Sequence, residues 1–558
     1  MSTHSPEKLS HDDEKVSDEV AQSNANTKVL HVENVDYALA LSTGPQLKAT
    51  SKRSLQLFAI LLVAFMGSLS NGFDGSVMSA VNGMEQYLTF FGISGLDAGG
   101  GVGSTTAIIF GIVTTSSFPV TSWPHRTSQY SIGSIAGVFI AGPIADSAGR
   151  RAGMCIGSVI IIAGAIVVTV AKNLAYLLGG RFFLGFGVAI STTAAPAYVV
   201  EMSPPQWRGR LTGLYNTFYY SGSILCTGIT IATGKIQSSS SWRVPLAIQI
   251  VPAAILAAFA FLLPESPRWL IAQGRKEEAL TILARYHGND DPDAPLVKLE
   301  WKEFEDSVKL DASDKRWWDY RELFNTRNAR YRTMMMLMMG FFGQWSGNGL
   351  GYFLTVLFGA IGVESQNGRL TLNFVNTIVS AIGALIGTTL TDKVGRRTMW
   401  FWGTLTCAGT LAIVTGCTAK WGASNANPAG ANAAVAFIFL FGFFYSITYT
   451  PLQALYPAEC LAYNTRAKGM AFYALAVSCA SFVNTYAGPI ALERITWKYY
   501  IVYIAWDLFE CAVIYFCAVE TKGRTLEELD EIFAAPNPVK KSTSKHEIKI
   551  VEKEGTTV

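Results

Sequence analysis

Long apolar stretches recur along most of the chain and predict helices that cross a membrane. A helix needs about 20 mostly apolar residues to span the hydrocarbon core of a bilayer. We expect such spans at 55–81, 152–171, 174–197, 211–234, 243–263, 331–360, 370–391, 398–419, 433–455, 467–491 and 497–518. A further span, between residues 104 and 145, is interrupted. The pattern therefore predicts an all-α polytopic membrane protein with twelve transmembrane helices.

A polar segment divides these spans into two groups of six, which predicts two pseudo-symmetric six-helix bundles. The expected parts are a tail at 1–54, a bundle at 55–263, a linker at 264–330, a bundle at 331–518 and a tail at 519–558.

The linker carries a helix-start signal, because Ser266 is an N-cap residue and Pro267 follows it. Residues 268–287 read as one amphipathic helix that ends before Gly288. We expect this helix to clasp the cytoplasmic ends of the two bundles, and a solvated connection is the alternative.

Charged motifs repeat in equivalent places of the two halves. DSAGRR at 146–151 follows the second span, and DKVGRR at 392–397 follows the eighth. Two spans later in each half, a Glu precedes an Arg by seven residues. Such a repeat is typical of transporters built from two parallel halves. The residues of this charged network are Asp146, Arg150, Arg151, Glu201, Arg208, Asp392, Arg396, Arg397, Glu459 and Arg466.

The distribution of basic residues suggests which side faces the cytoplasm. The motif loops carry nine Lys or Arg residues and the opposite loops carry seven, whereas 264–332 adds thirteen to the motif side. Cytoplasmic loops are enriched in Lys and Arg. We therefore expect both tails, the linker and the motif loops in the cytoplasm.

The second span is interrupted by the block 113–129, which holds two Pro, one His, one Arg and eight Ser or Thr. This block cannot continue a lipid-facing helix without leaving backbone groups unpaired. Without it, residues 104–112 and 130–145 form an unbroken span, and its Val and Gln borders suit splice-site codons. We interpret the block as a retained intron, with an outer-leaflet loop as the alternative. Sequencing the transcript tests this, and a mature message that encodes all of 113–129 contradicts it.

Charged residues also fall inside the predicted spans. Asp74 lies in the first span and Arg181 in the fourth. Because a charge at the bilayer centre costs roughly 2.5–3.5 kcal/mol, we expect the two to be partners. A carboxyl that is neutral when desolvated and ionised beside Arg181 can carry a proton; a static ion pair is the alternative. Asp507 and Glu510 share one face of the last span, and we expect a structural role, with proton coupling as the alternative.

Neutral polar residues recur at helical spacing on spans five, seven, eight and eleven, with aromatic residues between them. Amides supply both donors and acceptors, and aromatic faces stack on the C–H side of a sugar. The pattern therefore predicts a site for a neutral, hydroxyl-rich ligand, with polar contacts between helices as the alternative. The candidate sugar-binding residues are Phe73, Asn216, Tyr220, Ser223, Gln344, Asn348, Asn376 and Asn484.

The amino-acid composition argues against several classes of function. Only 15% of residues are charged, against about 25% in soluble domains. The net charge of +3 is too balanced for nucleic-acid binding. Because no nucleophile–base constellation and no set of metal ligands appears, we expect no enzyme, no cofactor and no metal.

Several segments resemble motifs of the sugar porters of the major facilitator superfamily (MFS). The resemblance runs from about residue 55 to 533, and rests on GFDGSVM (72–78), GGRFFLGFGVA (179–189), PAYVVEMSPPQWRGRL (196–211), PESPRWL (264–270), GQWSGNG (343–349), YPAECL (456–461), VETKGRTLEEL (519–529) and the two repeated loops. Through GQWSGNG and YTPLQALYPAE (449–459), the chain is similar to the fungal lactose permease and cellodextrin transporter group.

The resemblance implies roles for some of these residues. Asp74 falls at the position that distinguishes proton symporters from facilitators, and Arg181 at the position of its partner. The charged network is implied to latch the two halves while the cavity faces outward.

Departures from the family pattern bear on the substrate. Asn216 replaces a Gln, Gly343 replaces the first Gln of a pair, Gly349 replaces an Asn and Ala454 replaces a Trp. Each change removes side-chain volume, so we expect a pocket for more than one sugar ring and count Ala454 among the sugar-binding residues.

These observations lead to one expected function. We expect a monomer in the plasma membrane that binds sugar and proton and imports a disaccharide such as lactose or cellobiose, with hexoses as further substrates. An uncoupled hexose facilitator and a non-transporting sugar receptor are the alternatives.

Overall fold

The computed structural model describes residues 47–91, 129–313, 320–363, 365–421, 428–462, 465–522, 524 and 526–543. Most of the N-terminal tail, residues 113–128 of the suspected intron and the last fifteen residues therefore lie outside the described part. The regular structure of the described part consists of helices, which form two groups and two small appendages.

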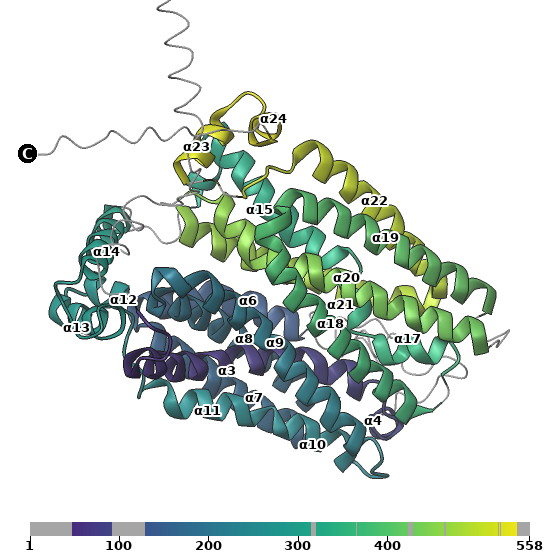
Figure 1. Ribbon diagram of the computed structural model, residues 1–558. Helices are drawn as coiled ribbons and strands as arrows, with labels where there is room; N and C mark the ends of the chain where they lie inside the picture. Colours follow the sequence, from purple (N-terminus) through teal and green to yellow (C-terminus); the bar gives the residue numbers. More distant parts are fainter. Residues whose placement is uncertain are drawn as a thin grey trace, which may run out of the picture.

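The first half of the chain forms the lower group of helices in Figure 1. Its helices are α3 (Lys52–Val81), α4 (Glu85–Phe90), α6 (Gln129–Ser147), α7 (Arg150–Thr169), α8 (Leu174–Met202), α9 (Pro205–Thr233), α10 (Ser240–Ile248) and α11 (Ile250–Ala260).

The second half forms the upper group of helices in the same view. Its helices are α15 (Arg327–Trp345), α16 (Asn348–Gly351), α17 (Leu354–Ala360), α18 (Gln366–Val394), α19 (Arg396–Trp421), α20 (Pro428–Cys460), α21 (Arg466–Ile495), the short η3 (Thr496–Lys498) and α22 (Tyr499–Cys517).

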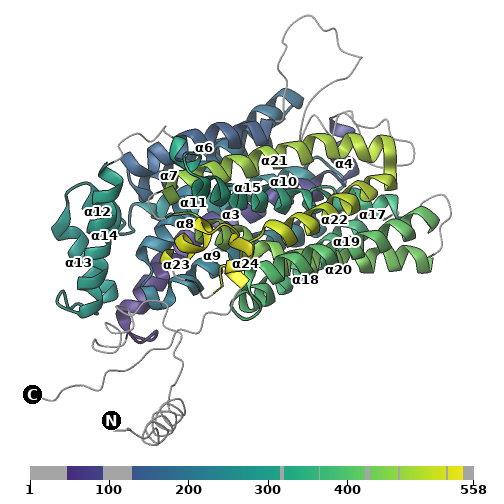
Figure 2. The ribbon, with the colours of Figure 1, turned by 90° about the horizontal axis from the view of Figure 1, so that it is seen from above.

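Two appendages complete the described chain. Between the halves lie α12 (Pro267–Ala272), α13 (Lys276–His287), α14 (Pro295–Ser313) and the short η1 (Arg321–Leu323), and after α22 lie α23 (Leu526–Ala534) and α24 (Pro538–Thr543). Figures 1 and 2 both place α12–α14 beside one end of the bundles, with α4 and α17 at the opposite end. We call these the linker end, which includes 146–151 and 392–397, and the far end, which includes 82–84, 361–363 and 365–366.

Nine helices of the described residues are long and apolar enough to cross a membrane. The other expected spans correspond to α6, α9 and the broken series α15–α17. The helix α9 carries many hydroxyl groups, but it packs against α3 and α18 at the junction of the two halves. Its polar side chains therefore have protein neighbours, which makes a spanning helix of lower hydrophobicity acceptable.

The seventh span differs from the continuous helix expected at 331–360. α15 ends at Trp345, and Gly347 adopts the left-handed backbone conformation with φ +90° before α16 begins at Asn348. Residues other than glycine rarely adopt this conformation. A Cβ at Gly347 would also lie 2.5 Å from the ring of Phe441. The apolar pattern continues through this break, so hydrophobicity alone predicts one helix.

The linker begins as predicted but contains two helices where one was expected. The Ser266 hydroxyl accepts the Trp269 N–H, with Pro267 at the first helical position. The helix then ends at Ala272, because Gly274 has φ +78° and reverses the backbone before α13. The end of α13 at His287, before Gly288, agrees with the prediction.

Glycines let α3 and α9 touch along their backbones. A Cβ on Gly72 would lie 1.9 Å from the carbonyl oxygen of Tyr219, and one on Gly222 would lie 2.0 Å from that of Leu69. Any larger residue would push the helices apart. This crossing fixes the position of α3 one turn from Asp74.

The two halves are joined at the far end. The Gln366 side chain donates to the carbonyl of Gly234 at 3.0 Å and accepts the Glu85 N–H at 3.0 Å. The Ser79 hydroxyl donates to the carbonyl of Gly351 at 3.0 Å, and Thr355 donates to the carbonyl of Ser79 at 2.5 Å. These bonds connect α3, α4 and α9 of the first half with α16–α18 of the second.

Candidate functional site

A buried ion pair lies inside the first half. Arg181 on α8 donates to Oδ1 of Asp74 on α3 at 3.0 Å, and both residues are at most 4% exposed. The other carboxylate oxygen of Asp74 makes no well-formed hydrogen bond among the described residues, although the Tyr130 side chain also interacts with this carboxylate. A buried oxygen without a well-formed bond is costly, so the two oxygens of Asp74 are not equivalent.

An aromatic ring covers the arginine. The guanidinium of Arg181 lies 4.6 Å from the ring centre of Tyr130, the second residue of α6. Such a contact stabilises a desolvated cation. Tyr130 thus belongs to the surroundings of the ion pair. The sequence did not reveal this contact, because Tyr130 directly follows the polar block 113–129.

Three of the predicted sugar-binding amides come together in the second half. The Asn348 side chain donates to the side chain of Gln344 at 2.9 Å, and the Asn484 side chain donates to the carbonyl of Gln344 at 2.5 Å. Gln344 lies just before the break between α15 and α16, and Asn348 lies just after it.

A hydroxyl on α9 reaches across to the second half. The Tyr220 hydroxyl lies 2.9 Å from that of Ser446 and 3.1 Å from that of Thr450, both on α20. Asn376 on α18 lies opposite Gly442, where a Cβ would be 2.9 Å from its Oδ1. Asn216 on α9 and Ala454 on α20 are both half-buried.

Phe73 and Ser223 do not join this polar group. Phe73 is 2% exposed and belongs to an apolar cluster that includes Val77 and, from the second half, Phe353. The Ser223 hydroxyl donates to the carbonyl of Gly72 at 3.0 Å, so it ties α9 to α3. In this conformation both residues serve helix packing, in contrast to the sugar contacts predicted for them.

The expected space beside two glycines is filled. A Cβ on Gly343 would lie 2.2 Å from the side-chain nitrogen of Gln453, and one on Gly349 would lie 2.6 Å from the hydroxyl of Tyr503. The inference that these departures enlarge the pocket is therefore wrong at both positions, because neighbouring side chains occupy the volume that a larger residue would take.

The repeated charged motif forms a compact network at the linker end of the first half. Arg150 binds both oxygens of Glu201 at 3.1 Å and also reaches Asp146 at 3.1 Å. The Ser266 hydroxyl donates to Glu201 as well, and Arg151 donates to the carbonyl of Phe261 at 2.6 Å.

The second half repeats this network. Arg396 binds the two oxygens of Glu459 at 2.9 and 3.2 Å. Thr521 donates to Glu459 at 2.6 Å, and Arg397 donates to the carbonyl of Tyr515 at 2.7 Å. Each of these arginines thus binds partners of its own half while the far end is joined, and a latch between the halves remains a prediction for the opposite conformation.

Three further network residues have different positions. Arg208 donates to Glu300 of the linker helix α14 at 3.0 Å, and Arg466 is the first residue of α21. The side chain of Asp392 lies outside the described residues.

Two further pairs, Glu265–Ser266 and Glu520–Thr521, belong to these networks. They occupy equivalent places in the two halves, which the sequence analysis did not recognise. Glu520 accepts the backbone N–H groups of Arg396 and Arg397 at 2.8 and 3.1 Å, and Glu265 lies against Gly149, the residue before Arg150. Burial raises the pKa of the Glu265 carboxyl. The sequence does carry a signal for this equivalence: in each half, an acidic residue followed by a hydroxyl residue comes after the last span.

A second missed cluster joins the linker to the first half. His287 and Glu300 are at most 3% exposed and contact each other. The second ring nitrogen of His287 lies 3.2 Å from the carbonyl of Met202. Together with Arg208, this cluster ties α13 and α14 to the loop between α8 and α9.

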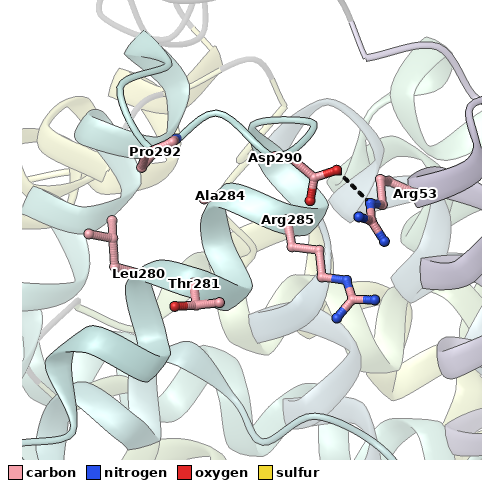
Figure 3. Close-up of a pocket in the computed structure, with 7 residues that line it drawn as sticks. All are labelled: Arg53, Leu280, Thr281, Ala284, Arg285, Asp290 and Pro292. Carbon is pink, nitrogen blue, oxygen red and sulfur yellow. Dashed lines mark hydrogen bonds and ion pairs between the residues drawn. The ribbon is translucent and has the colours of Figure 1, made fainter.

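Two pockets occur near these elements. One of about 480 Å³ lies between α3 and α13 and contains the ion pair of Arg53 and Asp290, 2.7 Å apart (Figure 3). The other, of about 460 Å³, is an apolar groove along α15 that includes Trp345 and Trp506. No predicted sugar-binding residue lines either pocket, so neither is the candidate transport site.

A family model described as sugar (and other) transporter matches residues 60–533. The chain belongs to this family. It is therefore a multi-pass membrane protein of a transporter family, in agreement with the resemblance of its motifs to sugar porters.

Relatives in fungi support the same assignment. The MFS-type transporter criB of Aspergillus cristatus is 30% identical over 421 residues, which cover 74% of this chain and 84% of the relative. High-affinity glucose transporter 1 of Candida albicans is 28% identical over 523 residues, which cover 90% and 91%.

A solved structure supports the fold. The structure of the MFS proton:xylose symporter XylE bound to 6-bromo-6-deoxy-D-glucose matches with a TM-score of 0.68 at 21% identity, covering 86% of this chain and 100% of that one. The predicted all-α MFS fold of twelve spans is confirmed.

The linker cluster yields a stability prediction. Glu300→Gln leaves Arg208 and His287 without their shared carboxylate, and loss of one partner of a buried pair costs about 3–5 kcal/mol. We expect proteolytic cleavage within α13–α14 of the purified protein to become about a hundredfold faster or more. Glu305→Gln is the matched control, because Glu305 binds Lys276 in an exposed pair at 2.7 Å. Equal cleavage of the two variants contradicts the role of the cluster.

Proposed function

We propose that this protein imports a sugar together with a proton by alternating access. The observation that carries the proposal is the Asp74 carboxylate, which is 2% exposed and has one oxygen on Arg181 and the other without a well-formed hydrogen bond among the described residues. A purely structural pair would be expected to satisfy both oxygens.

This asymmetry supports proton exchange at Asp74. When water reaches the pair, Asp74 is ionised and bound to Arg181; when the site is dry, a proton on the second oxygen lowers the cost of burial. The similarity in fold to a proton:xylose symporter supports this reading. A membrane potential of 100 mV adds about 2.3 kcal/mol per charge moved to the driving force.

The way the halves are joined supports alternating access. The far-end bonds of Gln366 and Ser79 link the halves, whereas the arginine–glutamate networks lie within them. We assign the linker end to the cytoplasm, with both termini, because of its basic residues. The far end then faces outward from the plasma membrane, and the described conformation is closed on that side.

The substrate that we propose is a disaccharide such as lactose or cellobiose. Since the space beside Gly343 and Gly349 is filled, the proposal depends on Asn216 and Ala454, together with the similarity of motifs to the fungal lactose permease and cellodextrin group. The names of the glucose-transporting relatives favour a hexose as the second candidate. We expect the functional unit to be a monomer.

Asp74→Asn tests proton coupling. The variant retains a polar side chain of equal size but binds no proton, so sugar accumulation in transporter-deficient cells should fall at least about tenfold, to the level reached with an uncoupler. Exchange of labelled for unlabelled sugar should persist. Asp290→Asn, at an exposed carboxylate of the linker, should accumulate sugar normally.

The outcomes separate the alternatives. Undiminished accumulation by Asp74→Asn contradicts proton coupling at this residue. If the unmutated protein itself does not accumulate sugar, the protein is a facilitator. Sugar binding without exchange in either protein indicates a receptor. The assays use both the full chain and a version that lacks 113–129.

Ala454→Trp tests the size of the substrate. The indole restores the volume that the related transporters carry at this position, so uptake of labelled lactose or cellobiose should fall about tenfold or more. Hexose uptake by the same variant, measured in parallel, shows that the protein is folded. Undiminished disaccharide uptake counts against the proposal.

A further inference from the structure

A second pair of acids is buried in the other half. Asp507 and Glu510 lie one turn apart on α22, and both are 0% exposed. The two oxygens of Asp507 and Oε1 of Glu510 make no well-formed hydrogen bond among the described residues, although Ser346 also interacts with Asp507 and Trp506 with Glu510. This is a larger deficit than that of Asp74, and it lies on a helix that is expected to be surrounded by lipid on one face.

No cation among the described residues compensates this pair. The titratable side chains that face it are Tyr449 from α20, Cys407 from α19, and Tyr503 and Cys511 from α22 itself. None of these groups is positively charged in either protonation state. Two carboxylates one turn apart in such surroundings cannot both be ionised without a very large cost. The pair must therefore hold at least one proton in this conformation.

A chain of hydroxyl groups contacts Glu510. Its Oε2 accepts from Ser346 and lies 3.2 Å from the hydroxyl of Tyr449. Tyr449 lies 2.7 Å from both Ser346 and Thr404, and Thr404 donates to the carbonyl of Trp400 at 2.9 Å. The chain thus ends on a fixed acceptor.

The same geometry serves both charge states of Glu510, because each hydroxyl can donate and accept. A neutral Glu510 donates to Ser346, which donates to Tyr449, which donates to Thr404. When Glu510 is ionised, the chain runs the other way: Thr404 donates to Tyr449, Tyr449 donates to Ser346, and Ser346 donates to Glu510. Apart from the proton itself, the two states differ only in hydroxyl rotation, so the site can take up and release a proton.

The site touches the break in the seventh span. Ser346 immediately precedes Gly347, where α15 gives way to α16. The segment beyond the break supplies the far-end contacts of Gly351 and Thr355 with Ser79 of the first half. Movement of α16 and α17 away from α3 therefore begins at the residue that Glu510 binds.

We propose that Asp507, Glu510, Ser346 and Tyr449 form a second proton-binding site, which favours closure of the far end when it is protonated. Proton loss places a net charge in a dry region, and opening of the seventh span at Gly347 relieves this by admitting water. Proton binding and far-end closure are thus linked, and each promotes the other. The proposal deepens the proposed transport function but does not require that Asp74 carry the coupled proton.

Hydrogen exchange of the purified full chain tests the proposal without sugar or a proton gradient. The parent for this experiment carries Asp74→Asn, which removes the titration of the first site. Exchange of peptides covering 79–86 and 347–360, corrected for the intrinsic effect of pH, is compared at about pH 6 and about pH 8. We expect protection in the parent to fall about fivefold or more at the higher pH.

Asp507→Asn with Glu510→Gln keeps the shape of the pair but removes its titration. We expect the pH effect to shrink to about twofold or less in this variant, and Glu510→Asp with Asp507 intact to retain it. Glu531→Gln, at an exposed carboxylate 3.4 Å from Lys541, is the matched control and should behave as the parent.

Two results overturn the proposal. One is a parent without a pH effect, or with an effect that the amide variant keeps. The other is a large fall in the thermal unfolding temperature of the amide variant, since amides should replace a protonated pair at little cost but an ionised pair only with destabilisation. Because sugar coupling is not measured, a failure of the proposed symport does not produce either result.

Discussion

The architecture depends on the requirement that a charge within the hydrocarbon layer have a partner of its own. Asp74 and Arg181 meet this requirement only if α3 and α8 are held in a fixed relation. The Gly72 and Gly222 contacts set α3 against α9, and Tyr130 on α6 covers the guanidinium. Several small-residue contacts of the first half therefore converge on one ion pair.

Each half is internally braced at the linker end by the same device. An arginine that follows a glycine turn binds a glutamate two spans later, and a second acid with its adjacent hydroxyl comes from the segment after the sixth span of that half. In the first half this segment leads into the linker, and in the second it leads into α23. Since these bonds lie within the halves, the halves can rotate as units without breaking them.

Much of the fold follows from the sequence because its signals are local. The positions of the spans depend on runs of about 20 apolar residues. The start of α12 depends on Ser266 and Pro267. The two arginine–glutamate pairs involve a charged motif that occurs twice in the sequence. The break at Gly347 escaped because hydrophobicity continues through it, so that only a backbone angle distinguishes one helix from two.

The details of the site were less predictable because they depend on residues far apart in the chain. The space beside Gly343 is taken by Gln453, and that beside Gly349 by Tyr503, which no local pattern reveals. His287 and Glu300 looked like members of a solvated linker until the fold buried them together. Phe73 is predicted as one of the aromatic residues between the polar positions, but the fold buries its side chain in an apolar cluster.

The crossing of α3 and α9 has a mechanical consequence. Where two helices touch backbone to backbone, no flexible side chain lies between them to absorb a small displacement. A shift of α9 against the opposite half is therefore passed to the acid-bearing turn of α3 almost without loss. The glycines thus hold the two helices as one rigid unit, so that any displacement of α9 also moves the turn of α3 that carries Asp74.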